Sequence, residues 1–563
     1  MLDSDLISLG WDSWRVDLTE RLRNVLVIDD LRAFQVTLKG MLLNMGATRI
    51  DFCDSGEQAL RDINRFDYDL IISDYNLGSQ RKNGRQLLEE LKARELLPST
   101  TLFVIVTGEN TRAMVLGALE NQPDDYVMKP FSHQQLSARL HRALEKRIEL
   151  QAVYDALAVK NYPTAIAACR ERIEAGSRYS NFCLCLMAEL YCTTGDYAKS
   201  EKMLRHFLAE RDTTWTRVAL ARTLVKSGQH EEAETLLQEL VAAQPLLLDA
   251  LDLLSENYAA RGQIEEAIAT IKAGTEISPL GILRQQRLAA MAVEIGDFEL
   301  ASQAFCQVYE LSRYSVHHSV DHMCDYVRIL FEAADRSPEP SRQRRLENEA
   351  FTVLSRARSA GSYPDFDFPC FEGVCQARLQ AQRGELVKAK KTFYKAAERY
   401  FAGNDFELPD VFLAEGVSTM AAIGEYEMAI EMAERLEKLE QRCFFAQSAL
   451  SDFRNNDDAN ESLKIFEKAN REGIAHYTRG ELAEAIKDFR LALTAAPTNT
   501  GVALNLIQSL LELSRTKRKS DINELTECRE TFKLLDGVPL PDKQKQRHRE
   551  LKQGFDALMS ERR

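Results

Sequence analysis

A pattern that recurs about every 34 residues constrains the fold of this chain more than any other feature. A glycine is followed by two polar or aromatic residues and, five positions after the glycine, by a small residue. Successive copies start at 160, 195, 228, 262 and 296, which is 35, 33, 34 and 34 residues apart. Lys160 replaces the glycine in the first copy, and later copies start at Gly384, Gly424 and Gly480. Most of the chain is therefore expected to be built from one repeated unit.

Each repeat has the features of a helical hairpin. Glycine permits a tight turn, a small residue lets two helices approach closely, and proline ends a helix. Three copies carry proline seventeen residues after the glycine, at Pro245, Pro279 and Pro497. This period and these features resemble the tetratricopeptide repeat. The resemblance implies an all-α superhelical solenoid over residues 150–515, with looser hairpins at 301–384 and 440–465 and a capping tail at 516–563.

Such an array binds a peptide or a helix of another protein on its concave face. When Gly228 is taken as the turn of its hairpin, the preceding helix places Trp215, Val218, Arg222 and Lys226 on that face. The next repeat places Asp249, Asp252 and Glu256 there. Any one of these residues could instead lie on an ordinary solvated helix face. The mixed charge leaves the sign of the ligand open.

A different periodicity occupies the first quarter of the chain. Apolar runs of strand length occur at Val25–Ile28, Ile50–Cys53, Leu70–Ile72, Leu102–Val106 and Tyr126–Met128. Helical patterns lie between and after them, near 32–45, 56–65, 84–97, 110–119 and 132–149. Five such units predict an open, doubly wound parallel sheet. In these sheets, ligands bind outside the carboxyl ends of the strands.

Polar side chains gather at that predicted edge. Asp29 and Asp30 follow the first strand, Asp74 follows the third, Thr107 the fourth and Lys129 the fifth. Three carboxylates repel one another unless a cation joins them, and their hard oxygen ligands favour Mg²⁺. An aspartate beside Mg²⁺ and a lysine can accept a phosphoryl group. A single aspartate at a strand end is more often a helix cap, but five such groups on one edge favour a site.

The segments Val27–Asp30, Ile72–Tyr75, Val106–Gly108 and Tyr126–Phe131 resemble the receiver domain of bacterial two-component response regulators. The resemblance covers residues 23–149, after an N-terminal extension at 1–22, and implies a flavodoxin-like fold.

The resemblance also implies roles for individual residues. Asp74 would accept phosphate from a histidine kinase, with Lys129 contacting the phosphoryl oxygens next to a cis Lys129–Pro130 bond. Asp29 and Asp30 would bind Mg²⁺ together with Asp74 and the backbone carbonyl of Asn76. Thr107 and Tyr126 would form the coupled switch pair.

Two features of the receiver-like sequence bear on its chemistry: the loop after Asp74 and the residue at position 109. The loop after Asp74 reaches Gly84 ten residues on instead of eight and contains no proline. The extra residues follow Asn76, so we expect altered loop dynamics with the chemistry kept. Glu109 lies where side chains tune hydrolysis of the phosphate, or it simply begins a solvent-facing helix.

Composition restricts the classes of function. The net charge of −14 argues against nucleic-acid binding. No apolar stretch is long enough to span a membrane, and the first residues lack the features of a signal peptide, so a cytoplasmic protein is expected. The eleven cysteines have no metal-binding spacing, and we expect buried free thiols.

These observations favour a phosphorylation-gated adaptor with no enzymatic activity beyond Mg²⁺-dependent phosphorylation and dephosphorylation of its own receiver. In the alternative, the repeats restrain a sensor kinase or an effector and the receiver releases it on phosphorylation. An effector enzyme or a DNA-binding regulator is disfavoured, because the motifs of the common effector enzymes are missing and there is no basic helix-turn-helix segment.

The junction between the two parts contains neither glycine nor proline from Ser132 to Lys160. Its apolar stripe predicts one helix that continues from the receiver into the first repeat, unbroken or mildly kinked. Two separate helices are the alternative.

Overall fold

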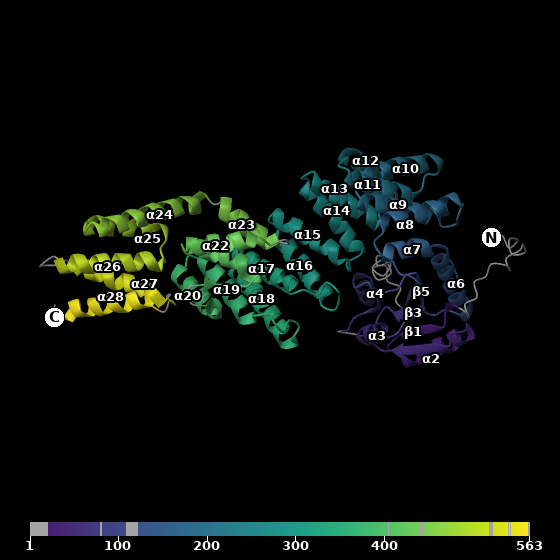
Figure 1. Cartoon of the computed structure of the whole chain (residues 1–563), viewed down its shortest axis with the longest axis horizontal. Coiled ribbons are helices and arrows are strands. Elements are labelled where there is room, and N and C mark those ends of the chain that lie inside the picture. Colours follow the sequence, from purple (N-terminus) through teal and green to yellow (C-terminus); the bar gives the residue numbers. More distant parts are fainter. Residues whose placement is uncertain are drawn as a thin grey trace, which may run out of the picture. The chain divides into compact units, whose positions relative to one another are not determined.

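The computed structural model describes residues 21–78, 81–108, 122–402, 405–439, 444–455, 457–516, 522–536, 538, 540 and 542–560. The chain divides into two compact units, Met1–Ser319 and Val320–Arg563, and each is described here by itself (Figure 1). Most of the N-terminal extension, Glu109 and the helix expected at 110–119 lie outside the described residues.

The first unit begins with a five-stranded parallel sheet in the order β2-β1-β3-β4-β5. The strands, which match the five apolar runs of the sequence, are β1 (Asn24–Ile28), β2 (Arg49–Cys53), β3 (Leu70–Asp74), β4 (Leu102–Thr107) and β5 (Asp125–Met128). The three central strands, β1, β3 and β4, are mostly apolar on both sides because helices cover both faces of the sheet. The predicted doubly wound parallel sheet is confirmed.

Four described helices flank this sheet: α2 (Arg32–Asn44), α3 (Gly56–Ile63), α4 (Gly84–Ala93) and α6 (His133–Glu149). One apolar cluster joins α2 and α6 to Val25, Val27 and Val104 of the sheet. A second cluster joins α3 and α4 to Leu26, on the opposite face. The alternation along β1 assigns successive side chains to the two faces.

The expected continuous helix over 132–160 is interrupted. Helix α6 ends at Glu149, and α7 (Gln151–Ala158) begins two residues later. Leu150 lies between them with φ −101° and ψ 15°, and its side chain is completely buried in a cluster with Cys169, Cys183 and Met187. Burial of Leu150 beneath the first repeats outweighs local helix propensity, which is a weak determinant. The alternative of two helices is the correct one.

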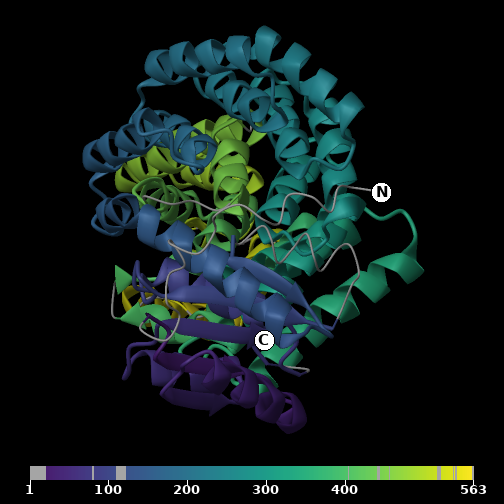
Figure 2. The same ribbon diagram turned by 90° about the vertical axis from the view of Figure 1, so that its right-hand side faces the viewer.

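The remainder of the first unit is a stack of antiparallel helices that curves in an arc, coloured from blue to teal in Figure 2. These helices are α7, α8 (Tyr162–Glu174), α9 (Ser180–Thr193), α10 (Tyr197–Glu210), α11 (Thr214–Lys226), α12 (His230–Ala243), α13 (Leu248–Ala260), α14 (Ile264–Ile277), α15 (Ile282–Glu294) and α16 (Phe298–Ser312).

The repeated glycines and small residues take the structural positions that their spacing predicts. All seven glycines have φ between +74° and +80°, a region that strongly favours glycine. Lys160, which replaces glycine in the first copy, is also left-handed, with φ 53°. The small residues are completely buried at the helix contacts, at Ala165, Ser200, Ala233, Ala267, Ala301, Ala389, Ala429 and Ala485.

The receiver contacts the first repeat directly through the loop that precedes β4. The Ser99 hydroxyl donates to Asp155 of α7 at 2.7 Å, and the Ser99 carbonyl accepts from Arg147 of α6 at 3.1 Å. Lys160 pairs with Glu95 at 2.7 Å. The start of the helical array is thus covered by the folded receiver.

The second unit continues the hairpin pattern with helices of less regular length. They are α17 (Val320–Asp335), α18 (Pro340–Ala360), α19 (Phe368–Gln382), α20 (Leu386–Ala396), α21 (Leu413–Ala422), α22 (Tyr426–Glu437), α23 (Phe444–Asn455), α24 (Asp457–Thr478), α25 (Leu482–Ala495), α26 (Thr500–Thr516), α27 (Ile522–Leu535) and α28 (Asp542–Ser560).

Two irregular features interrupt the second unit. Between α20 and α21 lie two 3₁₀ turns, Glu398–Tyr400 and Asp410–Phe412, and a small antiparallel pair, β6 (Phe401–Ala402) with β7 (Asp405–Phe406). The sequence pattern did not predict this pair.

The C-terminal helices pack on α26 through an apolar cluster that includes Phe532 and Phe555. Among the described residues, no helix is long and apolar enough to cross a lipid bilayer.

Candidate phosphorylation site and repeat groove

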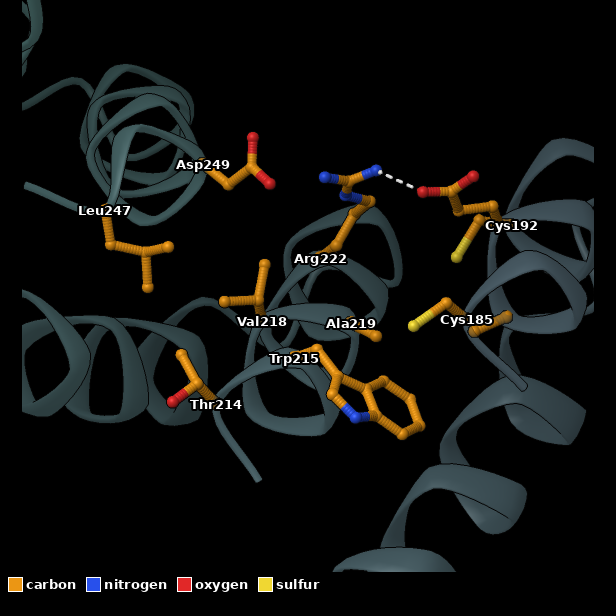
Figure 3. Close-up of a pocket in the computed structure, with 11 residues that line it drawn as sticks. Cys185, Cys192, Thr214, Trp215, Val218, Ala219, Arg222, Leu247 and Asp249 are labelled. Carbon is orange, nitrogen blue, oxygen red and sulfur yellow. Dashed lines mark hydrogen bonds and ion pairs between the residues drawn. The ribbon is translucent and has the colours of Figure 1, made fainter. Parts of the chain in front are cut away.

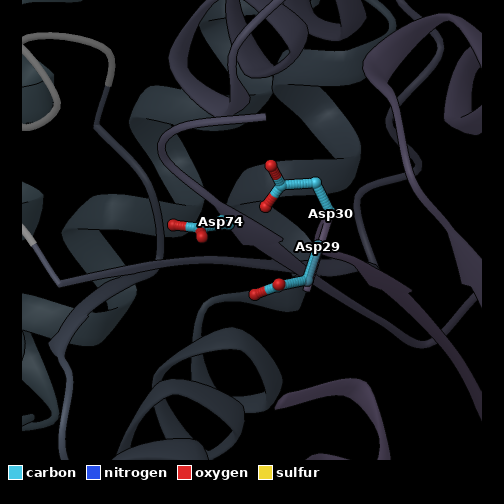
Figure 4. Close-up of side chains that lie close together, drawn as sticks. All are labelled: Asp29, Asp30 and Asp74. Carbon is cyan, nitrogen blue, oxygen red and sulfur yellow. The ribbon is translucent and has the colours of Figure 1, made fainter. Parts of the chain in front are cut away.

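Three aspartates meet at the carboxyl edge of the sheet. Asp29 follows β1 and is 1% exposed, whereas its neighbour Asp30 is exposed. Asp74 is the last residue of β3, next to β1, and is 8% exposed. Carboxylate oxygens of all three lie within 4.8 Å of one another (Figure 4). The parallel arrangement brings together residues that lie 45 positions apart in the sequence.

Lys129 supplies the positive charge of this edge. Its Nζ lies 2.7 Å from Asp29 Oδ2 and 2.9 Å from Asp74 Oδ2, and it also lies 3.8 Å from the centre of the Phe34 ring. The Lys129–Pro130 peptide bond is cis, as the resemblance to receivers implies. One ammonium group therefore bridges the two buried carboxylates.

The charge balance leaves the pocket short of cations. Burial raises the pKa of Asp74, and the Asp29 carboxylate adds to this effect, whereas the hydrogen bond and charge of Lys129 oppose it. Three carboxylates face one lysine, so a divalent cation would balance the charge. An all-oxygen donor set that is partly open to solvent fits Mg²⁺. Asp29, Asp30 and Asp74 therefore fit the metal that the fold implies.

Asn76 lies in the exposed loop two residues after Asp74, and its amide lies 3.4 Å from Asp74 Oδ1. Asn76 therefore lies beside the acidic pocket, where its backbone carbonyl would serve as a metal ligand.

The two switch residues lie on the neighbouring strands. Thr107 ends β4 and is 1% exposed, and its carbonyl accepts from the Lys129 amide at 2.7 Å. It comes directly after Val106, the residue paired with Asp74 across the sheet. Tyr126 lies on β5 and packs, half-buried, against the apolar cluster of α3 and α4. Both residues are within the layer that supports the acidic pocket.

The start of α4 packs directly against the backbone of Asp74. The Gly84 amide donates to the Tyr75 carbonyl at 3.0 Å. A Cβ atom on Gly84 would lie 2.2 Å from the Asp74 carbonyl oxygen and 2.7 Å from Ser73 Oγ. Asn83 and Gln86 close the helix end with a capping box. Glycine is required at position 84 by this close approach, which the lengthened loop preserves.

The predicted groove of the repeats contains a cavity of about 470 Å³ (Figure 3). Helices α9, α11 and α13 border it, each the first helix of its hairpin. The candidates Trp215, Arg222 and Asp249 line it, and so does Val218. Arg222 pairs with Glu189 at 3.2 Å. These residues thus share one concavity on the inner side of three successive repeats.

The other three groove candidates, Lys226, Asp252 and Glu256, are not among the residues that line the cavity, and each is held in an ion pair between repeats. Lys226 Nζ lies 2.6 Å from Glu256 Oε1. Asp252 accepts two hydrogen bonds at 2.8 Å from the buried guanidinium of Arg284. These pairs join neighbouring hairpins.

Sequence reasoning missed Glu189 and Cys185, which reach the cavity from α9. Glu189 stands 33 residues before Arg222, which is one repeat. Extending the register of Gly228 backwards by one repeat would have found both residues.

Comparisons with known proteins match both parts of the chain. The response regulator receiver domain family matches residues 25–141, and the tetratricopeptide repeat family matches residues 214–239, which span α11 and most of α12. The chain is 26% identical to the chemotaxis protein CheY-3 of Vibrio cholerae over 122 residues, which are 22% of this chain and 92% of that protein. It is 27% identical to CheY of Pseudomonas aeruginosa over the same length, which covers 96% of that protein.

Among solved structures, the signal receiver domain of an HD domain-containing protein from Pseudomonas fluorescens Pf-5 is 26% identical. The match covers 23% of this chain and 98% of that one, with a TM-score of 0.21. The order of the strands, the residues at their carboxyl ends and the two family matches all support the same family assignment. The chain carries a CheY-like receiver domain of the response-regulator family at its N-terminal end, followed by tetratricopeptide repeats.

Proposed function

We propose that this protein is a phosphorylation-gated adaptor of a two-component system. The receiver accepts a phosphoryl group on Asp74 from a histidine kinase, and the repeats bind a partner protein with an affinity that depends on this modification. The observation that carries the proposal is the meeting of Asp29, Asp30, Asp74 and Lys129 at one sheet edge, close to the start of α4, which contacts the end of α16. A cytoplasmic location is part of the proposal, and it agrees with the ten described cysteines, all of which are free thiols.

The chemistry assigned to the pocket is phosphoryl transfer to a carboxylate. A carboxylate oxygen of Asp74 attacks phosphorus while the bond to the donor breaks, and Lys129 neutralises charge on the phosphoryl oxygens. Mg²⁺ held by Asp29, Asp30, Asp74 and the Asn76 carbonyl would stabilise the same charge. Thr107 then donates its hydroxyl to a phosphoryl oxygen, and Tyr126 follows that movement.

Besides the Thr107–Tyr126 switch pair, helix α4 connects Asp74 to the repeats. Its first residue, Gly84, packs against the Asp74 carbonyl too closely for a Cβ atom and donates its amide to the Tyr75 carbonyl. Further along the same helix, Glu89 Oε1 lies 2.9 Å from Nε2 of His317, which follows α16. Burial opposes ionisation of Glu89, but the hydrogen bond with His317 and the charge of Arg85 hold its pKa below the usual range. This contact supports coupling between the phosphorylated loop and the array.

Phosphorylation of the 563-residue chain by acetyl phosphate tests the first half of the proposal. Intact-mass spectrometry should detect one phosphoryl group with Mg²⁺ and none with EDTA. Asp74→Asn should abolish the label, and Asp30→Asn should reproduce the loss of metal. Asp54→Asn is the matched control, because Asp54 also follows a strand of the sheet, β2, but lies outside the three-carboxylate cluster. Undiminished labelling of Asp74→Asn would refute the assignment.

Gating requires a separate measurement. Affinity capture with the wild type, with and without acetyl phosphate, and with Asp74→Asn should recover a partner whose yield changes only for the phosphorylated wild type. A partner recovered equally in all three samples would contradict gating.

A further inference from the structure

The cavity of the repeat groove combines an apolar floor with an excess of negative charge. Its floor consists of Val218, Ala219, Ala188 and Leu247, with the Trp215 indole at one side (Figure 3). Burial, with a contribution from Glu189, raises the pKa of Cys185 to about 12, so this thiol is neutral and adds to the apolar lining. The volume lies within the range of about 300–1,000 Å³ that is common for ligand sites.

Two carboxylates and one guanidinium surround this floor. Arg222 pairs with Glu189 at 3.2 Å, so its charge is already balanced. Asp249, an exposed residue at the start of α13, lines the cavity (Figure 3), and its carboxylate makes no hydrogen bond or ion pair with any residue that the structure describes. Burial raises the pKa of Glu189, and Asp249 raises it further, whereas Arg222 opposes both effects. The cavity therefore has one negative charge without a counterion.

Two described cations on neighbouring helices, Lys226 and Arg284, are already paired with other carboxylates. Lys226 is engaged by Glu256, and Arg284 is engaged by Asp252. A positive charge on a bound molecule would complement the Asp249 carboxylate at the rim of the cavity. Trp215 is half-buried at the edge of the cavity, and its ring face is suited to contact a Lys or Arg side chain of that molecule.

We infer that this cavity binds a segment of the partner protein in which a large apolar side chain is adjacent to a lysine or arginine. The apolar side chain enters between Val218 and Leu247, and the cation pairs with Asp249. This inference rests on the proposed adaptor function and specifies the chemistry of its partner. Trp215 is expected to be a principal contact, since buried tryptophans dominate many interfaces.

Four fluorescein-labelled peptides test the inference. Each has the same Gly-Ser frame of twelve residues with a central Phe-Lys, Phe-Glu, Ser-Lys or Ser-Glu pair. Fluorescence anisotropy with the 563-residue chain should show the Phe-Lys peptide binding at least about tenfold more tightly than the other three. Charge pairing should also make this preference weaken as salt is raised.

Variants of the cavity test the roles of single residues. Asp249→Lys should reverse the preference toward Phe-Glu, and Trp215→Ala should weaken Phe-Lys binding by about 30-fold. Glu239→Gln, which removes a similar charge from the exposed surface of α12, should leave all four affinities unchanged. Thermal melts followed by circular dichroism establish that each variant remains folded.

The outcomes separate this inference from the proposed function. Equal affinity for Phe-Lys and Phe-Glu, an unchanged preference in Asp249→Lys, or no binding of any peptide would overturn the inference about the cavity. Preferential Phe-Lys binding that is identical for the phosphorylated and unphosphorylated protein would support the cavity and contradict gating.

Discussion

Substitution of Gly84 by alanine is expected to slow phosphorylation of Asp74 strongly while leaving the receiver folded. The added Cβ atom would lie 2.2 Å from the Asp74 carbonyl oxygen, whereas ordinary van der Waals contact begins at 3.4 Å. The start of α4 or the backbone of Asp74 must therefore move by about 1.2 Å, the difference between these two distances. A misplacement of ~1 Å at a reacting group can reduce a rate by ~100-fold.

The rate of Asp74 phosphorylation by acetyl phosphate, followed on phosphate-affinity gels at fixed Mg²⁺, measures the effect. Gly84→Ala should be about 100-fold slower than the wild type. Gly40→Ala is the matched control: Gly40 lies in α2, and no heavy atom would come within 4 Å of its Cβ. This control should react normally and be more stable by ~0.5–1 kcal/mol, since alanine replaces glycine inside a helix.

The reasoning about close packing at Asp74 would be wrong if Gly84→Ala reacted within about threefold of the wild-type rate. The thermal melt of the variant decides whether a slow rate has a local cause. A fall in the melting temperature that is large enough to unfold the receiver at the assay temperature would instead make the lost rate a stability effect.

Three further predictions concern coupling and packing. Thr107→Ala should accept phosphate but lose the change in partner affinity, which couplings of ~1–3 kcal/mol place at roughly 5- to 150-fold; a wild-type response would exclude the Thr107 switch. The lowered pKa of Glu89 means that its contact with His317 contributes stability above pH 4.5, the unperturbed value, and loses it as the pH falls further. Glu89→Gln should therefore reduce the protection of α4 amides from exchange at pH 7, by an amount that shrinks steadily as the pH is lowered below 4.5, and an effect that did not change with pH would contradict this. Ala267→Leu, at a completely buried helix contact, should cost ~1–3 kcal/mol in urea unfolding, whereas an unchanged midpoint would show that the helices can separate freely.

The sheet and the acidic pocket were predictable because both follow from local patterns. The five apolar runs identified the strands. Because ligands bind at the carboxyl ends of parallel strands, Asp29, Asp74 and Lys129 were expected at one edge of the sheet. The hairpin turns were predictable for a similar reason, since a repeated glycine indicates a repeated left-handed conformation. A single copy of the repeat pattern is weak evidence for a hairpin, but several copies in phase are specific.

The features that the sequence did not predict depend on tertiary contacts. Leu150 lies inside an uninterrupted helical pattern, and only its burial against the first repeats explains the break between α6 and α7. In the groove, spacing identified the correct face but not the partner of each side chain. Lys226 and Asp252 pair with the next repeat because long or well-placed side chains reach across the hairpin boundary. Such pairings are decided by geometry that a single sequence does not contain.

The burial of Leu150 and the contacts of Ser99 and Lys160 have a consequence for how this architecture can be rearranged. A helical array usually requires a terminal repeat with a polar outer face, yet here a folded domain closes the first repeat. Lys160 adopts a left-handed backbone without the glycine that makes this conformation easy, and its ion pair with Glu95 ties that turn to the receiver. Exchange of the receiver for one from another protein would remove the Ser99 and Lys160 contacts, whereas Leu150 would keep its neighbours in the first repeats. The receiver and the first repeats therefore form one transferable segment, and recombination points that preserve folding lie beyond it.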